Sequence, residues 1–381
     1  MENTSVKTHP NDEIRVELDQ FLSGYEFEHG AVLVQIPQVP LDLLETTVAR
    51  NRGYFAYPPQ GLLYLSAVFR SIGIETNVLD LNYVTLKETK NENPNVEVVW
   101  QSALSEALSK FKTPLVCLSF MFDPTYPAFK QVTDYIRKQI PEACITVGGV
   151  AASADPERLL KLGLVDIVFS HEGEGSLKKF YQYLRKETEE LPVNLSFINT
   201  NKIIRHTQKS VGGDADLDIR EEYKKIPINQ YHEVGSICNH SRMVGIDVPF
   251  ATLLSRRGCR ARCSFCGVRN FNGAGLRVRT EDSVIQEMET LYHDYGIRYF
   301  DWLDDDLLYD RKGIIRLFKK MAEHFTDITW CANNGLIASA ITPEMMDGMR
   351  ESGCVGFKVG LESGNPQVLR EVHKPTNLPK F

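Results

Sequence analysis

The sequence has no block of basic residues and no long apolar run. Lys and Arg number 43 against 50 Asp and Glu, a formal net charge of −7 at pH 7. Binding of nucleic acid through its phosphates needs clustered Lys and Arg, so we expect no nucleic-acid partner. No stretch approaches the ~18 apolar residues of a membrane span, and residues 1–12 lack the apolar core of a signal peptide. These absences predict a cytoplasmic protein without a membrane span.

The sequence also lacks the regular cysteine spacing of a disulfide framework. Without that spacing or an export signal, its eight cysteines are expected to be reduced. Three of the scattered ones lie in apolar runs, where a thiol behaves as a small hydrophobe: Cys117, Cys144 and Cys354. Three others fall within eight residues, at Cys259, Cys263 and Cys266.

Short apolar runs alternate with helical patterns over residues 30–188, after a lead-in over 1–29. The runs predict five buried strands, at 31–36, 75–79, 114–119, 144–147 and 165–169. Helices are expected at 12–23 in the lead-in and at 62–72, 96–111, 126–140, 156–162 and 176–186. This alternation predicts a parallel, doubly wound α/β sheet with helices on both faces. Ligands of such sheets bind at the carboxyl ends of the strands.

Residues 189–250 are more polar and are expected to form a connector with one hairpin. From 251 to 381 the α/β alternation returns as four strand–helix units. The expected strands are 251–254, 299–303, 328–331 and 355–361, and three of the expected helices are 312–324, 343–351 and 366–372. The first unit's helix is expected to begin after Thr280, a plausible N-cap.

The three clustered cysteines carry the strongest chemical signal. Zinc sites need four ligands and usually pair their cysteines as CxxC, whereas the nearest histidines here, at 240 and 293, are distant in sequence. Three thiolates on one loop can hold three irons of a 4Fe–4S cluster and leave the fourth iron open. The amine and carboxylate of S-adenosylmethionine can chelate that iron, and an electron from the cluster then releases a 5′-deoxyadenosyl radical. Phe265 would place a flat apolar surface beside the adenine.

The run from Ser255 to Cys266 resembles the CxxxCxΦC signature of the radical S-adenosylmethionine (radical SAM) superfamily, and the likeness covers about residues 250–375. It implies a partial TIM-like barrel whose cluster is held by Cys259, Cys263 and Cys266. Polar residues at the carboxyl ends of barrel strands face the active site. The resemblance implies that four of them position S-adenosylmethionine: Asp304, Asp305, Glu362 and Ser363. Asn333 and Asn334 are similarly placed but less specific.

The first sheet lacks both a GxxxxGK[ST] loop and a GxGxxG turn, which disfavours nucleotide binding. Its Ser119-Phe120-Met121 and Gly148-Gly149 segments resemble the cobalamin-binding, flavodoxin-like fold. That resemblance implies a corrinoid site lined by Ser119, Gly148, Gly149, Gly173 and Glu174. The DxHxxG histidine that ligates cobalt in mutases is missing from Asp80-Leu81-Asn82. His171 is the nearest alternative ligand.

Together the two resemblances imply a cobalamin-dependent radical SAM methyltransferase that acts on an unactivated carbon or phosphorus centre of a small molecule. An electron donor such as flavodoxin or ferredoxin would serve it. Three alternatives stay open: a ring-closing or rearranging enzyme with the same cofactors, a non-catalytic cobalamin- or cluster-binding protein, and a zinc-stabilised module. Because four strand–helix units are fewer than the resembled barrel normally has, we expect a radical SAM domain that is incomplete at its C-terminal end.

Overall fold

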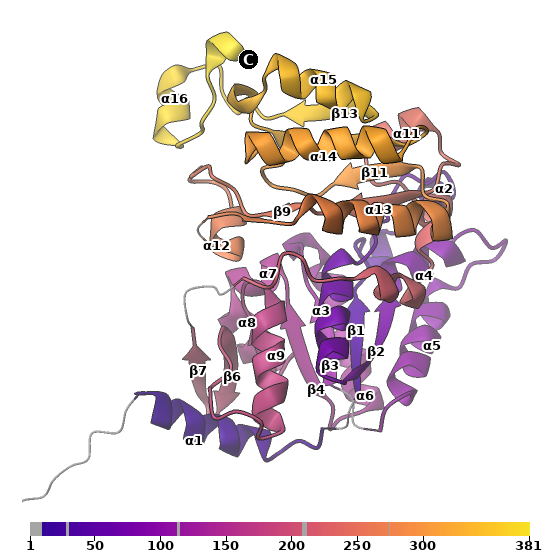
Figure 1. The fold of residues 1–381 in the computed structure, drawn as a ribbon. Helices are drawn as coiled ribbons and strands as arrows, with labels where there is room; N and C mark the ends of the chain where they lie inside the picture. Colours follow the sequence, from indigo (N-terminus) through magenta and orange to yellow (C-terminus); the bar gives the residue numbers. More distant parts are fainter. Residues whose placement is uncertain (1–9, 28–29, 113–114, 208–211, 274) are drawn as a thin grey trace, which may run out of the picture.

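A computed structural model describes residues 10–27, 30–112, 115–207, 212–273 and 275–381 (Figure 1). Residues 1–9 and 28–29 of the expected lead-in lie outside these ranges. The helix expected at 12–23 is α1 (Pro10–Leu22), and its Leu18 and Leu22 are buried against the first sheet. Among the described residues, no helix has the length and apolar character to span a membrane.

The first sheet has seven strands in the order β2-β1-β3-β4-β5-β6-β7. The five predicted strands are β1 (Gly30–Gln35), β2 (Glu75–Asp80), β3 (Leu115–Ser119), β4 (Cys144–Gly148) and β5 (Ile167–Phe169). They run parallel, so the doubly wound sheet is confirmed. The expected hairpin, β6 (Leu195–Asn199) and β7 (Lys202–His206), pairs antiparallel with β5. It therefore extends the sheet past residue 188 rather than lying in a separate connector.

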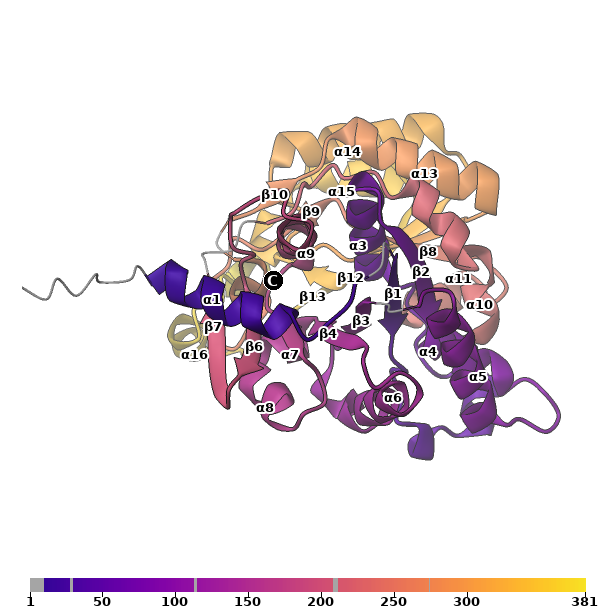
Figure 2. The same cartoon turned by 90° about the horizontal axis from the view of Figure 1, so that it is seen from below.

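Helices cover both faces of this sheet because inner strands such as β1 are apolar on both sides. Successive strand residues point to opposite faces. In β1, Ala31 and Leu33 join one core, whereas Val32 and Val34 join the other. The first core receives α3 (Gln60–Ser71) and α9 (Gly173–Leu184), and the second receives α5 (Val96–Ser109) and α6 (Tyr126–Gln139). Figure 2 shows the two layers from below.

Shorter helices join these elements. In the first domain they are η1 (Leu41–Leu43), α2 (Thr46–Arg50), α4 (Leu81–Glu88), η2 (Asp123–Thr125), α7 (Val150–Ala154) and α8 (Pro156–Lys161). The connector folds as η3 (Arg220–Lys225), η4 (Ile228–Gln230), α10 (Tyr231–Val234) and α11 (Asn239–Val244). The helix expected at 156–162 is thus matched by α8, and α7 was not predicted.

The second sheet has four parallel strands in the order β13-β12-β11-β8. They are β8 (Phe250–Leu253), β11 (Tyr299–Trp302), β12 (Thr329–Leu336) and β13 (Cys354–Val359). Helices α13 (Glu281–Tyr295), α14 (Arg311–His324) and α15 (Pro343–Glu351) lie side by side along it (Figure 1). Thr280 caps α13 as expected, since its side chain accepts from the Ser283 N–H. This is the fold of a partial barrel, as predicted.

The loop after β8 carries the cysteine triplet. It is flanked by an antiparallel pair, β9 (Arg256–Arg257) and β10 (Arg277–Val278), and contains α12 (Val268–Asn272). The last elements are η5 (Ala338–Ala340), α16 (Pro366–Glu371) and η6 (Leu378–Lys380). One apolar core runs without a break from the first sheet through the connector into the second. In Figure 1 the cysteine loop lies directly above the end of the first sheet that carries α7.

Candidate cofactor-binding site

Backbone contacts fix the loop that carries the three clustered cysteines. It starts at Gly258, whose φ of +91° is left-handed and where a Cβ would lie 2.5 Å from the Gly275 carbonyl oxygen. Further on, the Ser264 N–H donates to the Val372 carbonyl at 3.0 Å, just beyond α16. The loop therefore lies between β10 and the C-terminal segment of the described chain.

The three thiols have the chemistry of a cluster ligand set. All eight cysteines are free thiols, and Cys259 and Cys263 are half-buried whereas Cys266 is exposed. Burial, then the charges of Asp306 and Asp305, raises the pKa of Cys259. Burial also raises the pKa of Cys263, against the opposite effect of Lys374. Thiolates so placed need positive charge nearby, and iron supplies it on binding. The residues thus fit a 4Fe–4S cluster.

Two acidic residues after β11 anchor this loop. Asp304 is buried and accepts from the Ser255 N–H at 2.9 Å and from the Ser255 hydroxyl at 2.6 Å. Burial raises the pKa of Asp304 to about 6. Asp306, also buried, accepts from Nε and Nη2 of Arg260 at 2.7 and 2.8 Å. Both carboxylates therefore hold residues next to the cysteines, and Asp304 has no oxygen left without a protein donor.

Asp305, between these two acidic residues, accepts fewer hydrogen bonds than either of them. It is half-buried, and among the described residues its side chain accepts one hydrogen bond, from Asn272 Nδ2 at 3.0 Å. Burial, then the charge of Asp304, raises the pKa of Asp305 to about 7. An acid of this kind accepts a hydrogen bond or pairs with an incoming cation readily, because either relieves its charge.

The segment after β13 reaches the same loop. Glu362 has a φ of +66° and accepts from Lys374 Nζ at 2.9 Å, and the charge of Lys374 acts on Cys263. Ser363 is half-buried and its hydroxyl accepts from the Asn365 N–H at 3.0 Å. Phe265 is 56% exposed. The structure thus brings Glu362 to the cysteine loop, with a lysine that sequence reasoning missed.

The two asparagines after the predicted third strand fall inside β12. Asn334 donates to the Leu303 carbonyl at 2.8 Å. The Asn333 N–H donates to Asp301 at 3.2 Å, while the buried Oδ1 of Asn333 finds no partner among the described residues. Burial, then the Cys238 charge, raises the pKa of Asp301 to about 8.

Close packing explains one of the two predicted corrinoid glycines. The Phe120 N–H, after Ser119 at the end of β3, donates to the Gly148 carbonyl at 2.8 Å. Gly149 has a φ of +110°, and a Cβ there would lie 2.5 Å from the Phe120 oxygen. The fold itself therefore requires glycine at 149. A Cβ at Gly148 would lie 3.6 Å from the Phe169 oxygen, which is an ordinary contact. Packing therefore does not require glycine at 148, and the residue is available for contact with a ligand.

Glu174, one of the residues predicted to line the corrinoid site, forms a buried ion pair across the domains. Gly173 begins α9, and the next residue's carboxylate lies 2.5 Å from Arg257 Nη1. The Arg257 guanidinium also lies over the Tyr64 ring at 4.3 Å and 3.6 Å from Glu172. Glu172 pairs with Arg277 as well. The end of the first sheet is therefore joined to the residue two positions before Cys259. The sequence places Arg257 and Arg277 near the cysteine loop, but it does not identify their acidic partners.

Asn82 stands where the mutase histidine would, and it is buried, accepting from the Gln38 N–H at 2.9 Å and donating to the Phe55 carbonyl at 3.1 Å. Asp80 caps α4 by accepting from the Tyr83 N–H at 3.0 Å, and Tyr231 donates to its other oxygen at 2.7 Å. Burial raises the pKa of Asp80 to about 6. His171, the alternative ligand, has a φ of +67° and donates its N–H to the Ser153 hydroxyl. Its buried Nδ1 has no partner among the described residues.

Two family comparisons match the two domains. A model of the radical SAM superfamily matches residues 254–380, and a model of the B12 binding domain matches residues 46–180. The chain carries a B12-binding domain followed by a radical SAM domain. Radical SAM proteins use a 4Fe–4S cluster with S-adenosylmethionine, and B12 domains bind cobalamin.

Curated relatives resemble most of the chain. It is 24% identical over 320 residues to an uncharacterized methyltransferase of Pyrococcus horikoshii, covering 83% of this chain and 63% of that one. It is 24% identical over 348 residues to cytidylyl-2-hydroxyethylphosphonate methyltransferase of Streptomyces wedmorensis, covering 84% and 64%. A third relative, 22% identical over 330 residues, is the anaerobic magnesium-protoporphyrin IX monomethyl ester cyclase of Cereibacter sphaeroides, with 85% and 50% covered. The chain thus spans less than two thirds of these relatives' lengths.

Solved structures share the fold. The radical SAM methyltransferase TsrM from Kitasatospora setae matches with a TM-score of 0.67 at 17% identity, over 92% of this chain and 62% of that one. The cobalamin-dependent S-adenosylmethionine radical enzyme OxsB matches with a TM-score of 0.64 at 16% identity, over 92% and 46%. These likenesses confirm the α/β fold of the chain.

Proposed function

We propose that this chain belongs to a cobalamin-dependent radical SAM methyltransferase that methylates an unactivated carbon or phosphorus centre of a small molecule. The observation that carries the proposal is the contact between the end of the first sheet and the cysteine loop through Glu174 and Arg257. Methyl transfer requires the corrinoid and the radical source to face one substrate, and ligands bind at the carboxyl ends of strands in both sheet types.

The chain's own residues would bind and position the cofactors. When bound, the cluster and S-adenosylmethionine supply a 5′-deoxyadenosyl radical, and methylcobalamin supplies the methyl group. Cys259, Cys263 and Cys266 would hold three irons, with Phe265 beside the adenine. Asp305 and the Glu362–Lys374 pair have polar atoms near that loop for the methionine end. Ser119 and Gly148 would admit the corrinoid.

We also infer the setting in which the enzyme works. A radical SAM site needs one electron for each radical, so a small electron donor such as flavodoxin or ferredoxin is its expected partner. A reducing cytoplasm suits both that donor and the eight free thiols.

A ring-closing reaction is the second candidate. It is favoured by one of the curated relatives, which is named as a cyclase and not as a methyltransferase. The two reactions need the same two cofactor sites, so the fold does not separate them.

Anaerobically purified protein, reconstituted with iron, sulfide and cobalamin, tests the proposal. We expect about three to four irons and a bound corrinoid per chain, and 5′-deoxyadenosine after reduction. Methyl-labelled S-adenosylmethionine should label the corrinoid. 5′-Deoxyadenosine without label would favour the cyclase, and the absence of both would refute an enzyme.

Cys263→Ala is the matched variant. It should lose the cluster and 5′-deoxyadenosine while keeping the corrinoid, because the first domain is untouched. Cys354→Ala changes a half-buried thiol of β13 and should retain both cofactors. Full iron and cofactor cleavage in Cys263→Ala would refute the ligand assignment.

A further inference from the structure

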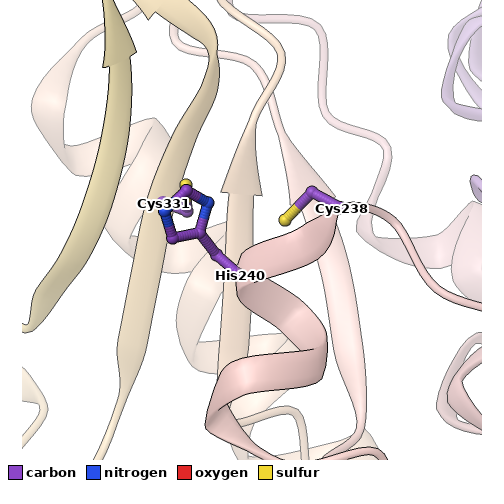
Figure 3. Close-up of side chains that lie close together, drawn as sticks. All are labelled: Cys238, His240 and Cys331. Atoms are coloured by element: carbon purple, nitrogen blue, oxygen red, sulfur yellow. The ribbon is translucent and has the colours of Figure 1, made fainter.

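A second group of thiols lies away from the cysteine loop. Cys238 is the N-cap of α11, His240 lies in the first turn of that helix, and Cys331 lies in β12. Their ligand atoms all lie within 4.8 Å of one another. Figure 3 shows the Cys238 sulfur pointing from the start of the helix toward the side chains of His240 and Cys331.

This group is separate from the candidate cofactor-binding site. The three clustered cysteines follow the carboxyl end of β8, whereas α11 lies beside the opposite end of the second sheet (Figure 1). Cys238 and Cys331 are 2% and 0% exposed, so both sulfurs lie in the interior. The connector and a barrel strand therefore meet through two buried thiols.

The imidazole of His240 has a ring nitrogen without a partner in the described structure. His240 Nδ1 is buried and finds no hydrogen-bond partner among the described residues. The ring lies against the backbone of β13, because a Cβ at Gly356 would overlap it. Buried polar atoms are almost always paired, so an unpaired imidazole nitrogen beside two thiols points to a ligand.

The sulfur of Cys238 has a backbone N–H and a hydroxyl beside it. It accepts from the Ser241 N–H at 3.3 Å and contacts the Tyr299 hydroxyl at 3.1 Å. Both groups stabilise negative charge on the Cys238 sulfur. Hydrogen bonds to a metal-bound thiolate are the usual outer contacts of such sites.

We propose that Cys238, His240 and Cys331 bind one zinc ion that fastens the connector to the second sheet. Two thiolates and one imidazole are a ligand set that zinc favours over harder cations. Bonds of about 2.0–2.3 Å in a tetrahedron place ligand atoms about 3.5–3.8 Å apart. The observed limit of 4.8 Å then requires inward movement of about 1 Å, within the reach of side-chain rotation.

The fourth ligand has a source in the neighbouring strand. Asp301 in β11 is paired with Cys331 in β12, and paired residues on parallel strands point to the same face of the sheet. Its carboxylate is a zinc ligand of the ordinary kind, and a water would serve in its absence. The ion would thus join the connector, β12 and β11.

Zinc content of a cluster-free protein tests this proposal. Replacing Cys259, Cys263 and Cys266 together by Ser removes the competing thiols and leaves the second group intact. Purified with Zn²⁺ and then dialysed, this variant should retain about one zinc per chain, and X-ray absorption should show sulfur and nitrogen ligands. Cobalt in place of zinc should give thiolate-to-metal absorption bands.

Single changes in that background identify the ligands. Cys331→Ser and His240→Gln should each lose stoichiometric zinc, whereas the matched control Cys354→Ser should keep it. Circular dichroism shows whether each variant folds. Should one unfold, the absorption spectrum of the parent variant decides instead.

Three results would overturn the inference. They are an absence of zinc from the folded parent variant, zinc unaffected by both ligand changes, and a Cys238–Cys331 disulfide detected by alkylation under denaturing conditions. Cluster assembly and 5′-deoxyadenosine in the protein with all its cysteines report separately on the proposed function, so the two ideas fail independently.

Discussion

Replacing Arg257 by Met should lower the free energy of unfolding by more than the loss of any exposed ion pair would. Arg257 is 8% exposed and its partner Glu174 is 9% exposed, with 2.5 Å between Nη1 and the carboxylate. Removing one partner of a buried pair leaves an unpaired charge in the interior, at a cost of about 3–5 kcal/mol. Glu172 does not relieve that cost, because it is a second carboxylate and is paired with Arg277.

The reciprocal change should cost less. In Glu174→Gln the side chain still accepts a hydrogen bond, and Arg257 keeps Glu172 at 3.6 Å and the Tyr64 ring at 4.3 Å. The loss should not exceed about 1.5–3 kcal/mol, the usual contribution of a hydrogen bond to a charged group, because Gln keeps an acceptor and loses only its charge. The double variant should be more stable than Arg257→Met alone, because the second change removes the unpaired carboxylate.

Urea unfolding of the cofactor-free proteins measures these differences. Arg311→Met is the control, since Arg311 and Glu344 lie 2.8 Å apart but their side chains are 56% and 59% exposed. Its effect should not exceed about 1 kcal/mol. The reasoning is refuted if Arg257→Met behaves like this control, or if the two changes are simply additive.

Four further substitutions follow from the geometry. Asp306→Asn should weaken the ion pair with Arg260 and so lower the amount of iron that the protein retains. The loss should be smaller than that caused by removing a cysteine, and iron per chain after gel filtration measures it. The carboxyl of Asp80 has a folded pKa of about 6 against 3.8 in the unfolded chain; its contribution is therefore fully present below pH 3.8 and is lost as pH rises through 6. The stability of the wild type relative to Asp80→Asn should fall by about 2.4 kcal/mol between pH 4 and pH 7, and an unchanging difference would contradict the raised value. Gly149→Ala, at φ +110°, should cost about 1–3 kcal/mol, whereas Gly148→Ala should unfold like the wild type and bind cobalamin more weakly; equal urea midpoints for the two variants would contradict the packing argument.

The sequence predicted what depends on local pattern. The run Ala31–Val34 is apolar on both sides, and such a run indicates a strand with helices on each face, as β1 has. The spacing of the three cysteines pointed to a cluster-binding loop, and the family comparison confirmed the radical SAM domain. The individual roles of the site residues stay predictions.

Contacts between segments that are distant in the chain could not be predicted from the sequence. The segment Gly173-Glu174-Gly175 indicates a turn near a ligand, yet the partner of Glu174 lies 83 positions away, and no local signal names it. Cys238 and His240 likewise carried no recognisable spacing, because their third member is in β12. The end of β12 was missed for another reason: Asn333 and Asn334 are polar, so the apolar run stops before the strand does.

The unbroken apolar core has a consequence for how this protein can be divided. Family boundaries separate a B12-binding part from a radical SAM part, but buried residues of α3, η3, β8 and α13 belong to one cluster. Cutting the chain between the two would expose apolar surface on both fragments. We therefore expect that neither domain can be replaced alone by the corresponding domain of a relative. A functional chimaera must also take the relative's connector and both of its contact surfaces.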